Sequence, residues 1–268
     1  MERCTRNDRR QTLLWYPNLM KIYLSRWVCL DVDSNLRRVG EEADMAAAHG
    51  ADLVVFPESF LHGYKRSVEP ARVRARFAEI SLAHPSTAFV FGSFSEEGKN
   101  RMTVWAAGKE AGRYDKVHLF QPNGEFEFWT PGDRYAAFTL RGFTWGLVNC
   151  NDIRFPEQTR ALKLKARCHA FIAVAWWPWR RDHVWRALLQ ARAIENAAWS
   201  LGCCVAASEY PEEPFAGAGN HVFNPLGDPV YPAEDRFYDL DLNTPPRVTV
   251  DPLDHDFPVG RVETFFVH

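Results

Sequence analysis

Three side chains that could cooperate in covalent catalysis each stand at the end of a predicted strand. Glu58 follows the apolar run 53–56 and a proline, Lys116 follows the predicted strand 112–115, and Cys150 follows the apolar run 145–149. In α/β architectures, ligands gather outside the carboxyl ends of strands, where rigid elements hold side chains and loops leave room for a substrate. We therefore expect the three side chains to face one pocket, although their spacing alone does not show that they meet.

The chemistry that these residue types would support is hydrolysis of an amide. A thiol becomes a good nucleophile when it ionises, and a neighbouring cation or a helix amino terminus lowers its pKa. Lys116 would supply that cation for Cys150, and the helix expected to begin near Pro156 would add a positive dipole end. Glu58 would take the thiol proton and return it to departing ammonia. Lys116 and the backbone N–H of Asn151 would stabilise the oxyanion of the tetrahedral intermediate.

Each of the three residues also has an ordinary structural explanation. A free cysteine at the end of an apolar strand often packs as a small hydrophobe, as Cys150 would. A lysine after a strand, such as Lys116, is usually solvated, and a glutamate after a proline, such as Glu58, often caps a turn or a helix. The residue types alone therefore leave both roles open.

Composition favours one globular domain that binds a small molecule. The chain has 268 residues, of which 46% are hydrophobic, enough for one sizeable core. Charged residues make up 25% and the formal net charge is -2, so we expect no nucleic-acid partner. No apolar run approaches the roughly 20 residues of a membrane span. We expect no membrane association.

The cysteines and the amino-terminal segment favour a cytoplasmic protein. The six cysteines are scattered without C-x-x-C spacing, which is typical of a reducing compartment. Residues 1–19 are rich in arginine but lack the apolar stretch of a secretory signal. We therefore expect residues 1–19 to be an extension outside the fold and residues 20–268 to form the domain.

The elements that would position these side chains alternate between strand and helix, with short hairpins between some of the strands. Arg141-Gly142 is expected to form one tight hairpin connection, and Asp182 to cap the longest late helix. Because hairpins interrupt the simple βαβ repeat, we predict a layered α/β sandwich and not a barrel or a doubly wound sheet. Helices are expected over 34–49, 72–83, 156–167 and 182–199, strands over 20–30, 52–56, 88–95, 102–107, 112–116, 136–140, 143–149, 171–175, 202–207, 221–224 and 229–232, and an extended surface tail over 244–258.

Three strings of the sequence closely resemble the signature blocks of the nitrilase superfamily of carbon-nitrogen hydrolases in order and spacing. They are Phe56-Pro57-Glu58, the segment Tyr114–Phe120 and the segment Cys150–Glu157. A fourth block, Ala191–Asn196, is similar to the short-chain amidase and omega-amidase branches. The similarity extends from residue 20 to about residue 231.

This resemblance implies a fold, an assembly and a set of roles. The fold would be a four-layer αββα sandwich that pairs with a second copy into a larger layered homodimer or higher homo-oligomer, without a metal or organic cofactor. Glu58 would be the general base, Lys116 the stabiliser of the oxyanion, and Cys150 the nucleophile that forms a thioester. The partner would be a small-molecule amide.

Many members of this superfamily carry a second glutamate after the lysine, and two residues are candidates for it here. Counting back from Pro131-Gly132 favours Glu125, and Glu127 remains open. In an extended segment, side chains two residues apart lie on one face, so both would point to the same side.

The substrate is less well defined by the sequence. Arg154 could bind the carboxylate of an omega-amide, or it could brace its loop by pairing with Glu157 or Asp152. Asn151 is similar to the D-amino-acid carbamoylase branch at that position, whereas Ile153 departs from it.

Two tryptophans and a glycine-rich segment complete the predicted surroundings of the substrate. Trp176 and Trp177 follow the strand expected over 171–175 and would form either an aromatic pocket wall or ordinary core. The segment 217–220 departs from the Gly-x-Ser often found there in the family, so no substrate preference is transferred from its branches.

Several other functions compete with amide hydrolysis. A nitrilase and an N-carbamoyl amidohydrolase are alternatives within the same superfamily, and a catalytically silent scaffold is the non-enzyme alternative. A zinc hydrolase would need ligands such as Cys168-His169 with Cys203-Cys204, but adjacent residues on a strand point to opposite faces. A dinucleotide-binding enzyme would need G-x-G-x-x-G, which is absent.

Overall fold

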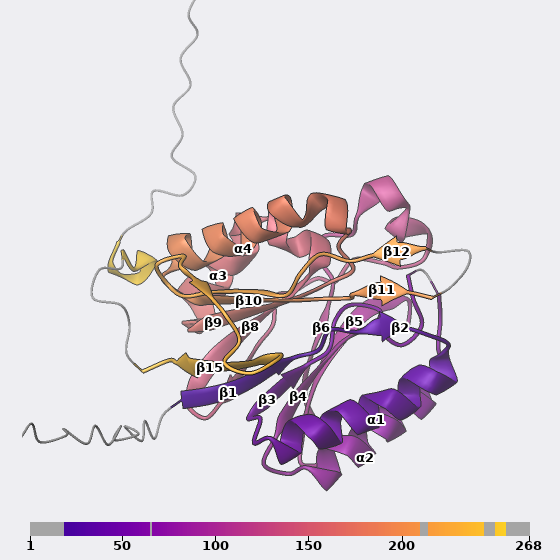
Figure 1. The fold of residues 1–268 in the computed structure, drawn as a ribbon. Coiled ribbons are helices and arrows are strands. Elements are labelled where there is room, and N and C mark those ends of the chain that lie inside the picture. Colours follow the sequence, from indigo (N-terminus) through magenta and orange to yellow (C-terminus); the bar gives the residue numbers. More distant parts are fainter. Residues whose placement is uncertain (1–18, 65, 210–213, 244–249, 256–268) are drawn as a thin grey trace, which may run out of the picture.

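Two six-stranded sheets lie face to face between two pairs of helices in the computed structural model, which describes residues 19–64, 66–209, 214–243 and 250–255 (Figure 1). Helices α1 (Val32–Ala48) and α2 (Pro70–Ala83) cover the outer face of the first sheet, and α3 (Pro156–Ala166) and α4 (Asp182–Asn196) cover that of the second. The predicted four-layer αββα sandwich is confirmed.

The first sheet brings together the ends of two strands that are far apart in the sequence. Its order is β15-β1-β3-β4-β5-β6. Strands β3 and β4 are parallel, β5 is antiparallel to β4, and β6 is antiparallel to β5, so β6 runs in the same direction as β3. The carboxyl ends of β3 and β6 therefore lie at the same edge. The bounds are β1 Leu19–Leu24, β3 Leu53–Val55, β4 Ala88–Glu96, β5 Lys99–Ala106, β6 Lys109–Asp115 and β15 Phe237–Asp241.

The second sheet has the order β14-β13-β10-β9-β8-β7, with β8, β9 and β10 parallel to one another. A small third sheet joins β2, β11 and β12 at one end of the sandwich (Figure 1). The bounds are β7 Ala137–Leu140, β8 Phe143–Asn149, β9 Ala170–Ala175, β10 Trp199–Cys204, β13 His221–Phe223 and β14 Pro229–Val230, with β2 Val28–Cys29, β11 Ala207–Ser208 and β12 Phe215–Ala216 in the third sheet.

Three apolar layers hold the sandwich together because the central strands are buried on both faces. In β1, Tyr23 packs toward the first helix pair, whereas Ile22 packs between the sheets. In β9, Ile172 lies between the sheets and Phe171 packs toward the second helix pair. Burial on both faces explains why these strands appear in the sequence as continuous apolar runs. Within the described ranges, every helix is too short or too polar to serve as a membrane span.

The structure confirms the Arg141-Gly142 hairpin, corrects two predicted boundaries and adds one strand. Both turn residues have positive φ, 49° and 81°, as a two-residue hairpin connection requires. The strand expected over 20–30 is split, because β1 ends at Leu24 and residues 28–29 join the third sheet. Strand β15 was not predicted. Residues 1–18 of the expected extension lie outside the described residues, whereas Leu19 already belongs to β1.

The predicted cap of α4 is wrong. Arg181 occupies the N-cap position after a short 3₁₀ turn, and Asp182 is the first helical residue. The Asp182 carboxylate instead accepts hydrogen bonds from the backbone N–H of Gly219 and from His221 Nε2, both at 2.8 Å. The Asp182 carboxylate therefore binds residues distant in the sequence and does not cap the amino terminus of its own helix.

The proline-rich end lies only partly within the described residues, which include 250–255 of the expected tail. There Asp251 pairs with Lys163 of α3 at 2.9 Å. This part of the tail is therefore anchored to the outer helix layer.

Gly92 of β4 fixes the path of the chain just before Glu58. A Cβ atom at this position would fall well inside contact distance of the carbonyl oxygens of Phe56 and Pro57. We expect Gly92→Ala to lower the free energy of unfolding by about 1 to 3 kcal/mol, because the backbone must move apart. Urea denaturation measures this change. Gly112→Ala is the matched control, since nothing lies within 4 Å of its Cβ position. Equal losses in the two variants would contradict the prediction.

Candidate active site

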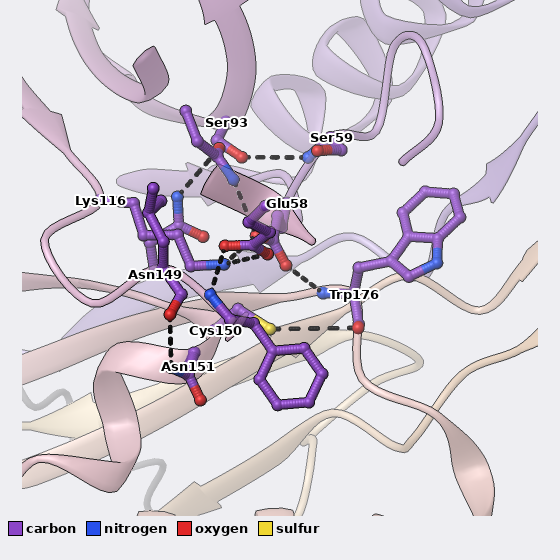
Figure 2. Close-up of polar contacts among 12 residues, drawn as sticks. Glu58, Ser59, Ser93, Lys116, Asn149, Cys150, Asn151 and Trp176 are labelled. Carbon is purple, nitrogen blue, oxygen red and sulfur yellow. Dashed lines mark hydrogen bonds and ion pairs between the residues drawn. The ribbon is translucent and has the colours of Figure 1, made fainter. Parts of the chain in front are cut away.

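The three side chains singled out in the sequence converge at one end of the sandwich (Figure 2). Glu58 follows β3, Lys116 follows β6 and Cys150 follows β8. Lys116 Nζ lies 2.9 Å from Glu58 Oε1 and 2.8 Å from Glu125 Oε1. The side chains of Lys116, Glu58 and Glu125 have no exposed surface. Two strands of the first sheet thus position the buried ionic cluster, and a strand of the second sheet brings Cys150 to it.

The Glu58 carboxylate is held in one orientation by donors from both sheets. Its Oε1 accepts hydrogen bonds from Lys116 Nζ and, at 3.0 Å, from Asn100 Nδ2 at the start of β5. Its Oε2 accepts a hydrogen bond from the backbone N–H of Trp176, just after β9, at 2.8 Å (Figure 2). Asn100 was not predicted, because a lone asparagine early in a strand carries no signal in the sequence.

Glu125 belongs to this cluster and Glu127 does not. Glu125 Oε1 also accepts a hydrogen bond from the Tyr64 hydroxyl, and its Oε2 accepts one from the Phe120 backbone N–H at 2.8 Å. Glu127 is exposed. The expectation that both glutamates share one face is wrong, because residues 125–127 form a 3₁₀ helix after left-handed Gly124, and side chains two residues apart on such a helix diverge.

Cys150 lies on a sharp turn at the end of β8. Its φ is 53°, in the left-handed region that a non-glycine residue adopts at a cost of about 1 to 3 kcal/mol. The residue begins a 3₁₀ helix, Cys150–Arg154, and its Sγ lies 4.0 Å from the Trp176 carbonyl oxygen. Arg192 of α4 braces this helix by donating from Nε to the Ile153 carbonyl oxygen at 3.0 Å. The predicted Ala191–Asn196 block thus positions the turn.

Buried Asp152 ties this turn to the segment that carries Lys116. One carboxylate oxygen accepts hydrogen bonds from the Tyr114 hydroxyl at 2.6 Å and the Asn149 backbone N–H at 3.0 Å. The other accepts from the His118 backbone N–H at 2.8 Å. The ends of β6 and β8 are therefore held in a fixed relation.

The electrostatics of the cluster differ from the sequence expectation for Cys150. Burial, and then the negative charge of Glu58, raise the pKa of Cys150 well above its usual value, against the opposing effect of Lys116. The predicted lowering is therefore wrong for this state of the site. Burial alone would lower the pKa of Lys116, but the negative charges around it, with Glu58 first, raise it well above its usual value. A neutral thiol beside a fixed carboxylate is poised for proton transfer.

A cavity of about 260 Å³ opens onto Cys150. Its lining includes all four residues predicted to bind substrate, Asn151, Arg154, Trp176 and Trp177. It also includes several residues that the sequence did not single out, among them Tyr64, Phe120, Arg181 and Phe215. These come from loops, from a 3₁₀ turn and from the two-residue strand β12, whose approach to the pocket has no periodic signal in the sequence.

Within the cavity, Asn151 and Arg154 play different parts. The Asn151 side chain donates from Nδ2 to the His118 carbonyl oxygen at 3.0 Å, so it braces the lysine segment. Arg154 has no carboxylate within ion-pair distance in the described part of the chain, so the alternative of a brace with Glu157 or Asp152 is not observed. Its Cζ instead lies 4.5 Å from the centroid of the Trp177 ring.

The arrangement of cysteines and histidines offers no zinc site among the described residues, which hold no group of three potential ligands. Cys203 and Cys204 point to opposite faces of β10, one between the sheets and one toward the outer helices. This is the geometry expected of neighbours on a strand.

Comparison with known proteins places these features in a family. A model of the carbon-nitrogen hydrolase family matches residues 20–220. Omega-amidase YafV of Escherichia coli (strain K12) is 30% identical over 216 residues, which cover 77% of this chain and 81% of the relative. The 2-oxoglutaramate amidase of Bacillus subtilis (strain 168) is 32% identical over 178 residues, 62% of this chain and 68% of the relative. The crystal structure of an amidase from Nesterenkonia sp. has a TM-score of 0.73 at 22% identity, covering 89% and 93% of the two chains.

Replacement of Glu58 by glutamine should lower the pKa of Cys150, because it removes the nearby negative charge and leaves that of Lys116 in place. Iodoacetamide reacts with the thiolate, so alkylation of Cys150 should reach its plateau at a lower pH in Glu58→Gln than in the wild type. Mass spectrometry of the Cys150 peptide after timed exposure, from neutral to strongly alkaline pH, measures this. Lys116→Gln should shift the profile the other way. An unchanged profile in Glu58→Gln would show that Glu58 does not control the thiol.

Proposed function

Because this chain belongs to the carbon-nitrogen hydrolase family, we propose that it cleaves a small amide through a thioester on Cys150, with release of ammonia. As a family member it is a hydrolase of carbon-nitrogen bonds other than peptide bonds. The observation that carries the proposed mechanism is the buried cluster in which Lys116 bridges Glu58 and Glu125 beside Cys150, the residue onto which the cavity opens.

In the first step, Cys150 Sγ attacks the amide carbonyl carbon as its proton moves to Glu58. Negative charge then develops on the former carbonyl oxygen, where the Lys116 ammonium and the Asn151 backbone N–H stabilise it. Glu58 passes the proton to the leaving nitrogen, the carbon-nitrogen bond breaks and ammonia departs. The product of this step is a thioester on Cys150 with Glu58 again ionised.

In the second step, water attacks the thioester carbonyl and gives a proton to Glu58. Collapse of the tetrahedral intermediate breaks the carbon-sulfur bond, the proton returns to Sγ, and the acid product leaves. Glu125 acts as the assisting glutamate, because it shares Lys116 Nζ with Glu58 and accepts a hydrogen bond from the Tyr64 hydroxyl. Each proton that leaves one group has an acceptor within the cluster.

The proposed substrate carries a carboxylate at the end remote from the amide. Arg154 has an unpaired guanidinium within the described residues and lines the cavity that opens onto Cys150, while Trp176 and Trp177 form its aromatic wall. Two of the relatives are an omega-amidase and a 2-oxoglutaramate amidase, which supports an amide substrate of this kind. A nitrile or an N-carbamoyl compound is the alternative substrate within the family.

We also propose a cytoplasmic homodimer. The outer face of α4 exposes Ile194, and the turn beside it exposes Leu226, which gives the second helix layer an apolar patch suited to a second copy. Sedimentation velocity tests this proposal, and a monomer at micromolar concentration would refute it. No disulfide joins any two of the five described cysteines, as suits a reducing compartment.

Cys150→Ala should abolish ammonia release while the protein stays folded, because the nucleophile is lost and no buried charge is left unpaired. Ammonia is measured for wild type and variant across short amides, dicarboxylic monoamides, nitriles and N-carbamoyl amino acids, and carbon dioxide is measured for the last group. Circular dichroism checks the fold.

Ammonia with acid from amides supports the proposal, whereas turnover of nitriles or carbamoyl compounds alone would select an alternative. Unchanged turnover in Cys150→Ala would reject the mechanism, and a wild type without any turnover would favour a scaffold.

Glu125→Gln should reduce kcat by about 100-fold or more, because it weakens the hold on Lys116 and removes a carboxylate from the proton-transfer cluster. Glu127→Gln is the matched control, since Glu127 is exposed two residues away. Steady-state ammonia release with the best amide of the panel measures both variants. A comparable loss of kcat in Glu127→Gln would contradict the assignment of the assisting role to Glu125.

A further inference from the structure

Arg181 is a second arginine in the wall of the cavity that opens onto Cys150, and the proposed mechanism does not use it. It ends the 3₁₀ turn Trp179–Arg181 after β9, whereas Arg154 ends the 3₁₀ helix after β8. Arg181 Cζ lies 5.7 Å from the centroid of the Phe120 ring, and Arg154 Cζ lies 4.5 Å from that of Trp177. Each guanidinium is thus held over its own aromatic ring, which leaves its N–H groups available to a ligand.

Neither guanidinium is neutralised within residues 19–64, 66–209, 214–243 and 250–255. No carboxylate of these ranges lies within 4.0 Å of Arg154 or Arg181, and the buried Arg181 Nε has no hydrogen-bond partner there. Burial, and then the positive charge of Arg181, lower the pKa of Arg154, so the two cations repel each other. Exposed Arg180 also lines the cavity and adds positive charge.

Two buried arginines with a structural role, Arg101 and Arg192, differ from the cavity arginines because each is paired with a carboxylate. Buried Arg101 binds Glu96 at 2.8 Å and Asp115 at 2.7 Å. Arg192 binds Glu195 at 2.6 Å. The nearby carboxylates of the active site, Glu58 and Glu125, are already bound to Lys116. The unpaired state of the two cavity arginines therefore sets them apart as ligand-binding groups.

We propose that the substrate is a dianionic amide, with one anionic group bound at Arg154 and a second at Arg181, both remote from the scissile bond. In a bidentate pair, one guanidinium binds both oxygens of one carboxylate. Because Arg154 and Arg181 are held over separate rings, each can bind a carboxylate of its own. The chemical class is a monoamide of a tricarboxylic acid. This inference rests on the proposed amidase function and makes Arg181 a specificity-determining residue.

A series of amides on one five-carbon frame tests the number of charges. The probes are pentanamide, which is neutral, the monoamides of glutaric and 3-methylglutaric acid, which carry one charge, and the terminal monoamide of 3-carboxyglutaric acid, which carries two. For the wild type, kcat/KM should be about tenfold higher for the dianion than for the 3-methyl compound, which has a branch of similar size without the charge. Equal or lower kcat/KM for the dianion would overturn the inference.

Arg181→Gln should remove this tenfold preference for the dianion over the 3-methyl compound. Arg186→Gln is the control, because Arg186 is an exposed arginine of α4 that does not line this cavity, and it should keep the preference. A preference that survives Arg181→Gln, or that is lost equally in Arg186→Gln, would overturn the assignment of Arg181.

Binding separates failure of this inference from failure of the proposed function. In the Cys150→Ala background, calorimetry should show the dianionic amide binding about tenfold more weakly when Arg181 is also changed to glutamine. Binding of this kind without wild-type turnover would refute the amidase proposal and support the dianion site. Turnover of amides without the charge preference would refute the dianion site alone.

Discussion

The rest of the site depends on one buried ammonium. The side chain of Lys116 has no solvent-exposed surface, and an ion in that position costs several kcal/mol unless it is paired and hydrogen-bonded. Glu58 and Glu125 supply that pairing, yet they are themselves fully buried and must in turn be satisfied. Asn100 and the Trp176 backbone N–H bind Glu58, and Tyr64 and the Phe120 backbone N–H bind Glu125. A single charge thus specifies the positions of several loops from both sheets.

Such a cluster contributes little net stability, since a buried ion pair often does no better than well-packed apolar residues. Its value lies in fixed geometry and in strong fields within a dry site, where charges act more strongly than in water. The strained φ of Cys150 fits the same description. The turn is kept in place by Asp152 below it and by Arg192 from α4. Stability elsewhere, chiefly the three apolar layers, offsets these local costs.

The cavity separates two kinds of charge. Beside Cys150, each group of the ionic cluster has a partner of opposite sign, and burial and the negative charge of Glu58 raise the pKa of the thiol. On the cavity wall, Arg154 and Arg181 have no such partners within the described residues and stand over aromatic rings. In the proposed function, the region around Cys150 suits the neutral amide group of the substrate. The wall that carries Arg154 and Arg181 suits the anionic part of the same substrate. The proposed reaction and the proposed substrate selectivity would therefore depend on different parts of one pocket.

The sequence by itself determined the order of most elements, the αββα class and the positions of Glu58, Lys116 and Cys150, because apolar periodicity and short family blocks are local properties of the chain. Only the tertiary structure decided that residues 20–30 split between two sheets, that β15 pairs with β1, and that Asp182 binds Gly219 and not its own helix end. It also placed Glu125, and not Glu127, beside Lys116, through a 3₁₀ helix that the sequence pattern did not reveal. The tertiary structure also decided that the pKa of Cys150 is raised and that Arg181 has no carboxylate partner among the described residues. The reason is that burial and the distances between charges depend on where distant segments of the chain meet in space.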